Sequence, residues 1–111
     1  MPETQFSVSR TTPRFSFIAE AELAETGDGM HVVARISELS ARGCYVDTVN
    51  PFPMGTELRV RVRYGCSTCE LSGKVIYTHS GYGMGVLFGE TDAKHRATLD
   101  AWLDELARKS S

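Results

Sequence analysis

Apolar and polar residues alternate along most of the chain, which is the pattern of β-strands with one buried face. The clearest run is ELRVRVRY at 57–64, in which four apolar residues alternate with one glutamate and three arginines. Similar runs recur between segments that are rich in glycine and proline and therefore favour turns. We predict six strands, over residues 15–23, 30–40, 44–49, 57–64, 70–80 and 84–89.

Two of the connecting segments have distinctive sequences. NPFPMG at 50–55 is predicted to be a loop because it holds two prolines and a glycine, and GCSTC at 65–69 is predicted to form a turn. Gly73 interrupts the fifth run, where a glycine typically marks a bulge or a bend. Short strands at this regular spacing favour a small antiparallel barrel.

The last segment changes to the period of a helix. After Thr91 and Asp92, either of which can cap a helix, four apolar side chains recur at helical spacing. These are Leu99, Trp102, Leu103 and Leu106. We expect Trp102 in the core rather than at a ligand, because large aromatic side chains are usually buried. The sequence therefore predicts a mainly β fold, a six-stranded antiparallel β-barrel with a C-terminal α-helix.

Composition limits the class of function. A chain of 111 residues suits one domain, and its formal net charge of -2 argues against attachment to a nucleic acid polymer or a membrane by overall charge. Nine of the twelve basic residues are arginine, although a GC-rich genome would give the same bias. Because the arginine fork matches phosphates and base edges, an anionic ligand is expected to bind local arginines.

The expected location is the cytoplasm. The first ten residues, MPETQFSVSR, have neither the basic start nor the apolar centre of a signal peptide. No apolar run reaches the length of a transmembrane helix. The odd number of cysteines, at positions 44, 66 and 69, favours reduced thiols.

Three local patterns carry the functional information. RTTPR at 10–14 places two arginines four residues apart, at the end of a polar segment that is predicted to be flexible and just before the first strand. ELSARG at 38–43 ends the second strand with the spacing Glu-x-Ser-x-x-Gly. GYGMGVLF at 81–88 is a late strand bracketed by glycines.

In this order and at this spacing, the three patterns resemble the PilZ domain family, over about residues 10–107. The resemblance implies a barrel that is a bacterial receptor for the second messenger cyclic di-GMP, bound as an intercalated dimer, without a cofactor or an enzymatic activity. The domain would span 10–108 after a flexible arm at 1–9 and would signal to an unidentified effector protein. The ligand-binding residues that it implies are Arg10, Arg14, Glu38, Ser40 and Gly43.

The residue types suit such a ligand. An arginine fork can bind the O6 and N7 edge of guanine or clamp a phosphate. Ser40 could donate its hydroxyl, and Gly43 would allow a close backbone approach or a turn with positive φ. Glu38 stands where the family has Asp or Asn, and its side chain is one methylene longer. We expect the leader with Arg10 and Arg14 to be disordered when empty and to close over the ligand, so that a partner reads the change.

Three other interpretations remain open. The first is a PilZ-like adaptor that has lost the nucleotide and works by protein contact alone, and Glu38 is the feature that separates it from a receptor. The second is a redox switch at Cys66 and Cys69. The spacing of this pair also occurs in zinc sites, but the chain has no further ligands at a matching spacing. The third is a binding surface on the arginine face of 57–64, for which a solvated face neutralised by nearby glutamates is the simpler explanation. Catalysis has little support, and His79 is interpreted as a turn residue.

Overall fold

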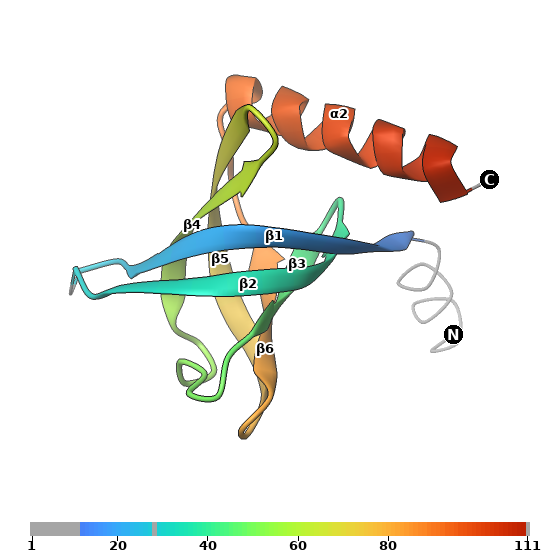
Figure 1. The fold of residues 1–111 in the computed structure, drawn as a ribbon. Helices are drawn as coiled ribbons and strands as arrows, with labels where there is room; N and C mark the ends of the chain where they lie inside the picture. Colours follow the sequence, from blue (N-terminus) through green and yellow to red (C-terminus); the bar gives the residue numbers. More distant parts are fainter. Residues whose placement is uncertain (1–11, 28, 111) are drawn as a thin grey trace, which may run out of the picture.

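The computed structural model describes residues 12–27 and 29–110 and shows a closed β-barrel with a helix across one end (Figure 1). The elements are β1 (Arg14–Glu25), β2 (His31–Ser40), β3 (Gly43–Asp47), β4 (Glu57–Tyr64), β5 (Ser67–His79), β6 (Gly83–Phe88) and α2 (Ala93–Ser110). Every strand is antiparallel to both neighbours, in the order β1-β2-β3-β6-β5-β4. The predicted six-stranded antiparallel barrel with a C-terminal helix is confirmed.

The alternating pattern of the sequence explains the core of the barrel. In β4 the side chains of Leu58, Val60 and Val62 are buried, whereas the arginines between them are exposed. In β1 every second residue from Phe17 to Leu23 is buried in the same way. Since burial of one such Val or Leu side chain contributes about 1.5–3 kcal/mol, this pattern is a large part of what stabilises the fold.

Irregular pairing in three strands breaks the simple alternation. In β2 the register shifts between Ile36 and Glu38, so that both Ile36 and Leu39 are buried. In β5 the shift against β6 lies between Val75 and Tyr77. Of the bulge or bend expected at Gly73, the bulge is wrong, because Gly73 pairs in regular register with both neighbouring strands. β1 also shifts against β2, between Ser16 and Ala19.

The helix α2 begins at a side-chain cap and covers one end of the barrel (Figure 1). Asp92 is the cap, since its Oδ1 accepts a hydrogen bond from the backbone N–H of His95 at 3.0 Å. Leu99 and Trp102 are buried, and the Trp102 ring packs on Phe17 and Tyr64 at centroid distances of 5.7 and 5.5 Å. Trp102 is therefore a core residue, as predicted.

The connection between β4 and β5 is tighter than the predicted turn at 65–69. Only Gly65 and Cys66 lie in the turn, and Gly65 adopts the positive φ that a glycine tolerates. Next to this hairpin, the arginine face of β4 is solvent-exposed. Arg61 lies 2.7 Å from a carboxylate oxygen of Glu70 and 3.9 Å from one of Glu22. These contacts support a solvated, internally neutralised face.

None of the helices in the described part of the chain is both long enough and apolar enough to cross a membrane.

Candidate functional site

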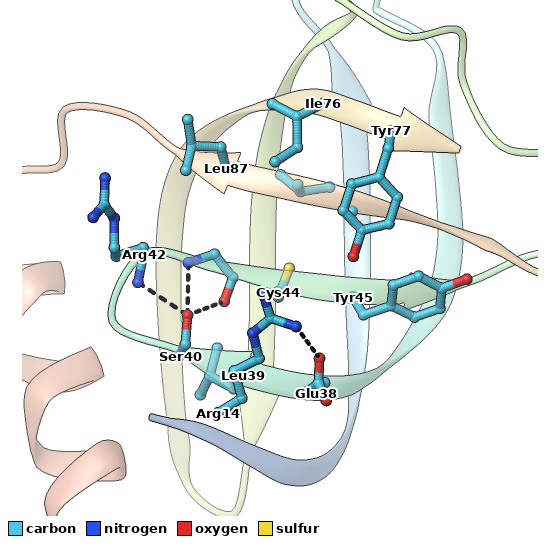
Figure 2. A pocket seen from close by; sticks show the side chains of 13 residues that line it. Arg14, Glu38, Leu39, Ser40, Arg42, Cys44, Tyr45, Ile76, Tyr77 and Leu87 are labelled. Atoms are coloured by element: carbon cyan, nitrogen blue, oxygen red, sulfur yellow. Dashed lines mark hydrogen bonds and ion pairs between the residues drawn. The ribbon is translucent and has the colours of Figure 1, made fainter. Parts of the chain in front are cut away.

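One surface pocket gathers most of the residues that the sequence singled out (Figure 2). It lies where the start of β1 meets the end of β2, the start of β3, the C-terminal part of β5 and the middle of β6. Its polar side is formed by Arg14, Glu38, Ser40, Arg42 and Gly43. Its apolar side is formed by Leu39, Cys44, Tyr45, Ile76, Tyr77, Gly85, Val86 and Leu87.

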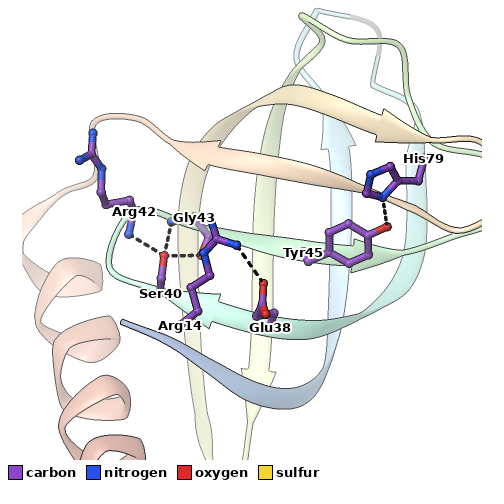
Figure 3. Close-up of polar contacts among 7 residues, drawn as sticks. All are labelled: Arg14, Glu38, Ser40, Arg42, Gly43, Tyr45 and His79. Atoms are coloured by element: carbon purple, nitrogen blue, oxygen red, sulfur yellow. Dashed lines mark hydrogen bonds and ion pairs between the residues drawn. The ribbon is translucent and has the colours of Figure 1, made fainter. Parts of the chain in front are cut away.

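The sequence placed Arg14 on a leader before the first strand. In the structure it is instead the first residue of β1. It pairs with Ser40 of β2, so its backbone position is set by the sheet. Its Nη1 lies 4.0 Å from Oε1 of Glu38, which makes a loose ion pair at the pocket rim (Figure 3). Arg10, the other arginine of the predicted pair, lies outside the described residues. The structure thus brings together four of the five predicted ligand-binding residues.

Ser40 holds the tight turn between β2 and β3. Its Oγ accepts hydrogen bonds from the backbone N–H groups of Arg42 at 3.1 Å and Gly43 at 3.2 Å, and donates one to the carbonyl of Gly43 at 3.3 Å. A serine that caps successive backbone N–H groups in this way stabilises a turn. Because only 9 % of Ser40 is exposed, its hydroxyl acts here chiefly on the protein's own backbone.

Gly43 is required for close packing rather than for a left-handed turn. The glycines with positive φ in the described residues do not include Gly43, so that part of the sequence interpretation is wrong. Gly43 pairs with Leu87 of β6, and a Cβ at this position would overlap the carbonyl oxygen of Val86. The glycine therefore lets β3 and β6 approach each other beside the pocket.

An aromatic and aliphatic wall faces the arginines, and sequence reasoning missed it. Tyr77 and Leu87 are 39 % and 40 % exposed at this wall, and Tyr45 lies beside them (Figure 2). Two glycines of the GYGMG run make room for the rings, since a Cβ at Gly85 would overlap the Tyr77 ring and one at Gly83 would crowd Tyr45. The only sign of this wall in the sequence was the pair of glycines at alternate positions of β6, Gly83 and Gly85, which leave space for large side chains on neighbouring strands.

The Tyr45 ring is held by a hydrogen bond. Its hydroxyl lies 2.9 Å from Nδ1 of His79 at the end of β5 (Figure 3). His79 is therefore a strand residue that positions Tyr45, and not the turn residue that was predicted. Desolvation, with Tyr77 and Asp47 nearby, raises the pKa of the Tyr45 hydroxyl above its ordinary value.

The three cysteines lie in different environments. Burial raises the pKa of the Cys44 thiol, at the floor of the pocket, to about 12. Burial likewise raises the pKa of Cys69 to about 11, and its Sγ donates to the carbonyl of His95 at 3.3 Å. Cys66 is exposed in the hairpin turn. A disulfide between Cys66 and Cys69 would remove the Cys69 thiol from its contact with α2.

Iodoacetamide at about pH 8 is expected to modify Cys66 quickly and the other two thiols only after unfolding, because only thiolates react and a raised pKa keeps the buried thiols protonated. Mass spectrometry of digested protein over time checks this, with Cys66→Ser as the control that loses the fast phase. Rapid labelling of Cys69, or a Cys66–Cys69 disulfide formed under mild oxidation, would support the redox switch instead.

The pocket can bind a ligand through several kinds of contact. Arginine side chains supply charged donors at its rim, and tyrosine supplies flat apolar surface on the opposite side. Within the described residues, no group of three or more His, Cys, Asp or Glu side chains could hold a metal ion. The arrangement suits an anion that carries planar rings.

Comparison with known proteins places the chain in a family. The model of the PilZ domain matches residues 9–105, close to the span predicted from the sequence. No curated protein matches the sequence. Among solved structures, the PilZ domain of CeSA from a cellulose-synthesizing bacterium has a TM-score of 0.70 and 16 % identity, and the match covers 86 % of this chain and 99 % of that one.

Two further structures share the fold. The PilZ domain of YcgR from Escherichia coli, solved with c-di-GMP, has a TM-score of 0.74 and 14 % identity, covering 91 % of this chain and 93 % of that one. The MrkH–c-di-GMP complex from K. pneumonia has a TM-score of 0.74 and 15 % identity, covering 91 % of this chain and 53 % of that one. With the barrel, the helix and the family match over most of its length, the chain belongs to the PilZ domain family.

Proposed function

We propose that this protein is a receptor for cyclic di-GMP, which it binds in the pocket between Arg14 and the Tyr77 wall. The observation that carries the proposal is the meeting of Arg14 with the Ser40–Gly43 turn at one pocket that also has an aromatic side. Membership of the PilZ family supports it, and two structures that share the fold, YcgR and MrkH, were solved with this nucleotide.

The chemistry of the pocket suits the two parts of the nucleotide. Arg14 is exposed at the rim, where its guanidinium can bind a phosphate or the O6 and N7 edge of a guanine. The ring of Tyr77 offers a flat face to a base on the other side of the pocket. The turn held by Ser40 presents backbone close to the ligand, and Gly43 keeps that turn packed on β6.

The N-terminal arginine loop completes the proposed site. Arg10 would close over the nucleotide from the segment before β1, and four of its proposed companions, Arg14, Glu38, Ser40 and Gly43, already lie at the pocket. An intercalated dimer of the nucleotide would place more than one guanine within reach of these arginines. The altered surface would then be read by an effector protein in the cytoplasm, and no catalytic step is involved.

Glu38 separates this proposal from a second candidate, a PilZ adaptor that no longer binds nucleotide. The carboxylate of Glu38 lies 4.0 Å from the Arg14 guanidinium and therefore competes with a phosphate for it. Because 67 % of the Arg14 side chain and 46 % of the Glu38 side chain are exposed, this ion pair is weak. A ligand with two phosphates can displace such a contact, which favours the receptor.

Isothermal titration of cyclic di-GMP into the wild-type protein is expected to give saturable binding at micromolar concentrations. Glu38→Asp is expected to tighten binding by about three-fold, because the shorter side chain releases Arg14 and the ion pair that it gives up is worth less than about 1 kcal/mol. Glu20→Asp is the matched control, since Glu20 is an exposed glutamate of β1 that does not line the pocket.

Absence of heat for both the wild type and Glu38→Asp at tens of micromolar protein would reject the receptor and favour the adaptor. Binding by Glu38→Asp alone would show that the glutamate is what removes nucleotide binding from this chain.

A further inference from the structure

The turn between β2 and β3 carries a third arginine, Arg42, whose backbone is held at both ends. Its N–H donates to Oγ of Ser40 at 3.1 Å, and its carbonyl accepts from the N–H of Phe88 in β6 at 2.8 Å. These two bonds fix the backbone of Arg42 without using its side chain. Any residue other than proline could make them, so the turn itself does not explain why an arginine stands here.

The side chain of Arg42 lies at the edge of the pocket, on the other side of Ser40 from Arg14. Figure 3 shows the two arginines on opposite sides of the Ser40 hydroxyl, and Figure 2 shows the Arg42 side chain extending away from Arg14. Among the ion pairs of the described residues, none involves Arg42. Its charge is therefore uncompensated there, whereas that of Arg14 faces Glu38.

The charge balance of the pocket points to a role for this arginine. Among the described residues of the lining, Arg14 and Arg42 are the cations and Glu38 is the anion. Without Arg42, this described lining would offer a ligand with two phosphates only Arg14, which is paired with a carboxylate. A guanidinium without a carboxylate partner has no competing contact to give up. Its fixed backbone also means that only side-chain freedom is lost on binding.

We propose that Arg42 is a further ligand-contacting residue, which binds a phosphate of the cyclic dinucleotide on the side of the pocket opposite Glu38. This inference rests on the proposed receptor function and adds a contact to it. Arg14 and Arg42 then hold the ligand from both sides of the Ser40 turn. Arg42 makes its contact without closure of the N-terminal segment.

Titration of cyclic di-GMP into Arg42→Gln is expected to give binding about 10-fold weaker than that of the wild type, because a charge-assisted hydrogen bond is lost. Arg42→Lys should recover part of the affinity, and the affinity of Arg42→Gln should fall less steeply with added salt than that of the wild type. The matched control is Arg59→Gln, which removes an exposed arginine of β4 outside the pocket and should bind like the wild type.

The outcomes separate this inference from the receptor proposal. If the wild type binds and Arg42→Gln binds within about two-fold of it, the role of Arg42 is rejected and the receptor stands. If the wild type does not bind, both are rejected. Should Arg42→Gln melt at a lower temperature than the wild type, the Nε–H signal of Arg42 in the wild-type NMR spectrum decides: a shift on saturation supports the contact, and an unmoved signal rejects it.

Discussion

Replacement of Gly43 by alanine is expected to destabilise the barrel by about 3 kcal/mol and to abolish nucleotide binding at the proposed site. The added Cβ would overlap the carbonyl oxygen of Val86, a backbone atom that no side-chain rotation can move. Relief requires β3 to separate from β6, which weakens their ladder and the hydrogen bond from Phe88 to Arg42. The turn that carries Ser40 would move with it.

Urea denaturation followed by circular dichroism measures the loss, and the titration described above measures binding. Gly89→Ala is the matched control, because the nearest atom to its Cβ would be the Ser72 hydroxyl oxygen at 3.2 Å, which belongs to a side chain that can move. A Gly43→Ala variant whose free energy of unfolding stays within about 0.5 kcal/mol of the wild type would show that the strands tolerate a side chain here.

Arg14→Ala should weaken cyclic di-GMP binding by about 100-fold while leaving the fold intact. The variant removes a charged donor at the pocket rim, and it also leaves Glu38 without its counter-charge facing the incoming phosphates. Stability should change by less than about 1 kcal/mol, because the ion pair that is lost is exposed and long. Binding and stability are thus expected to separate in this variant.

The measurement is a pair of experiments on the same protein, a nucleotide titration and a thermal melt. Arg59→Ala serves as control, because it removes an equal charge from a face that the pocket does not include. Wild-type affinity in Arg14→Ala would place the nucleotide elsewhere on the barrel. A large drop in melting temperature would instead assign Arg14 a structural role.

The barrel could be predicted from the sequence because each strand, and the helix, shows its own pattern of apolar residues within a short segment. The alternation in 57–64 identifies a half-buried strand by itself, and the helical spacing around Trp102 identifies the covering helix. The bulges could not be predicted, since each depends on how a strand meets its neighbour. The shift after Ile36 and the one after Val75 are properties of strand pairs.

The polar half of the candidate site was also predictable, whereas its other half was not. Glu38, Ser40 and Gly43 lie within one short motif, so their proximity follows from the sequence. Tyr45 belongs to β3 and Tyr77 to β5. The two side chains reach the same pocket only because β6 pairs with both of these strands. Which of the two roles offered for Gly43 applies could not be decided for the same reason, because the atom that its missing side chain must avoid belongs to β6.

Closure of the barrel has a consequence for how the protein folds. β1 pairs with β4 as well as β2, and β3 pairs with β6, so several ladders join segments far apart in the chain. Such non-local pairing gives the fold a high contact order. Folding is therefore expected to be slow, in the range of milliseconds to seconds as for comparable barrels. The pocket draws on β1, β2, β3, β6 and β5, so it is complete only when the ladders between these five strands have formed. A ligand bound there is expected to stabilise the folded protein by mass action, rather than any single hairpin.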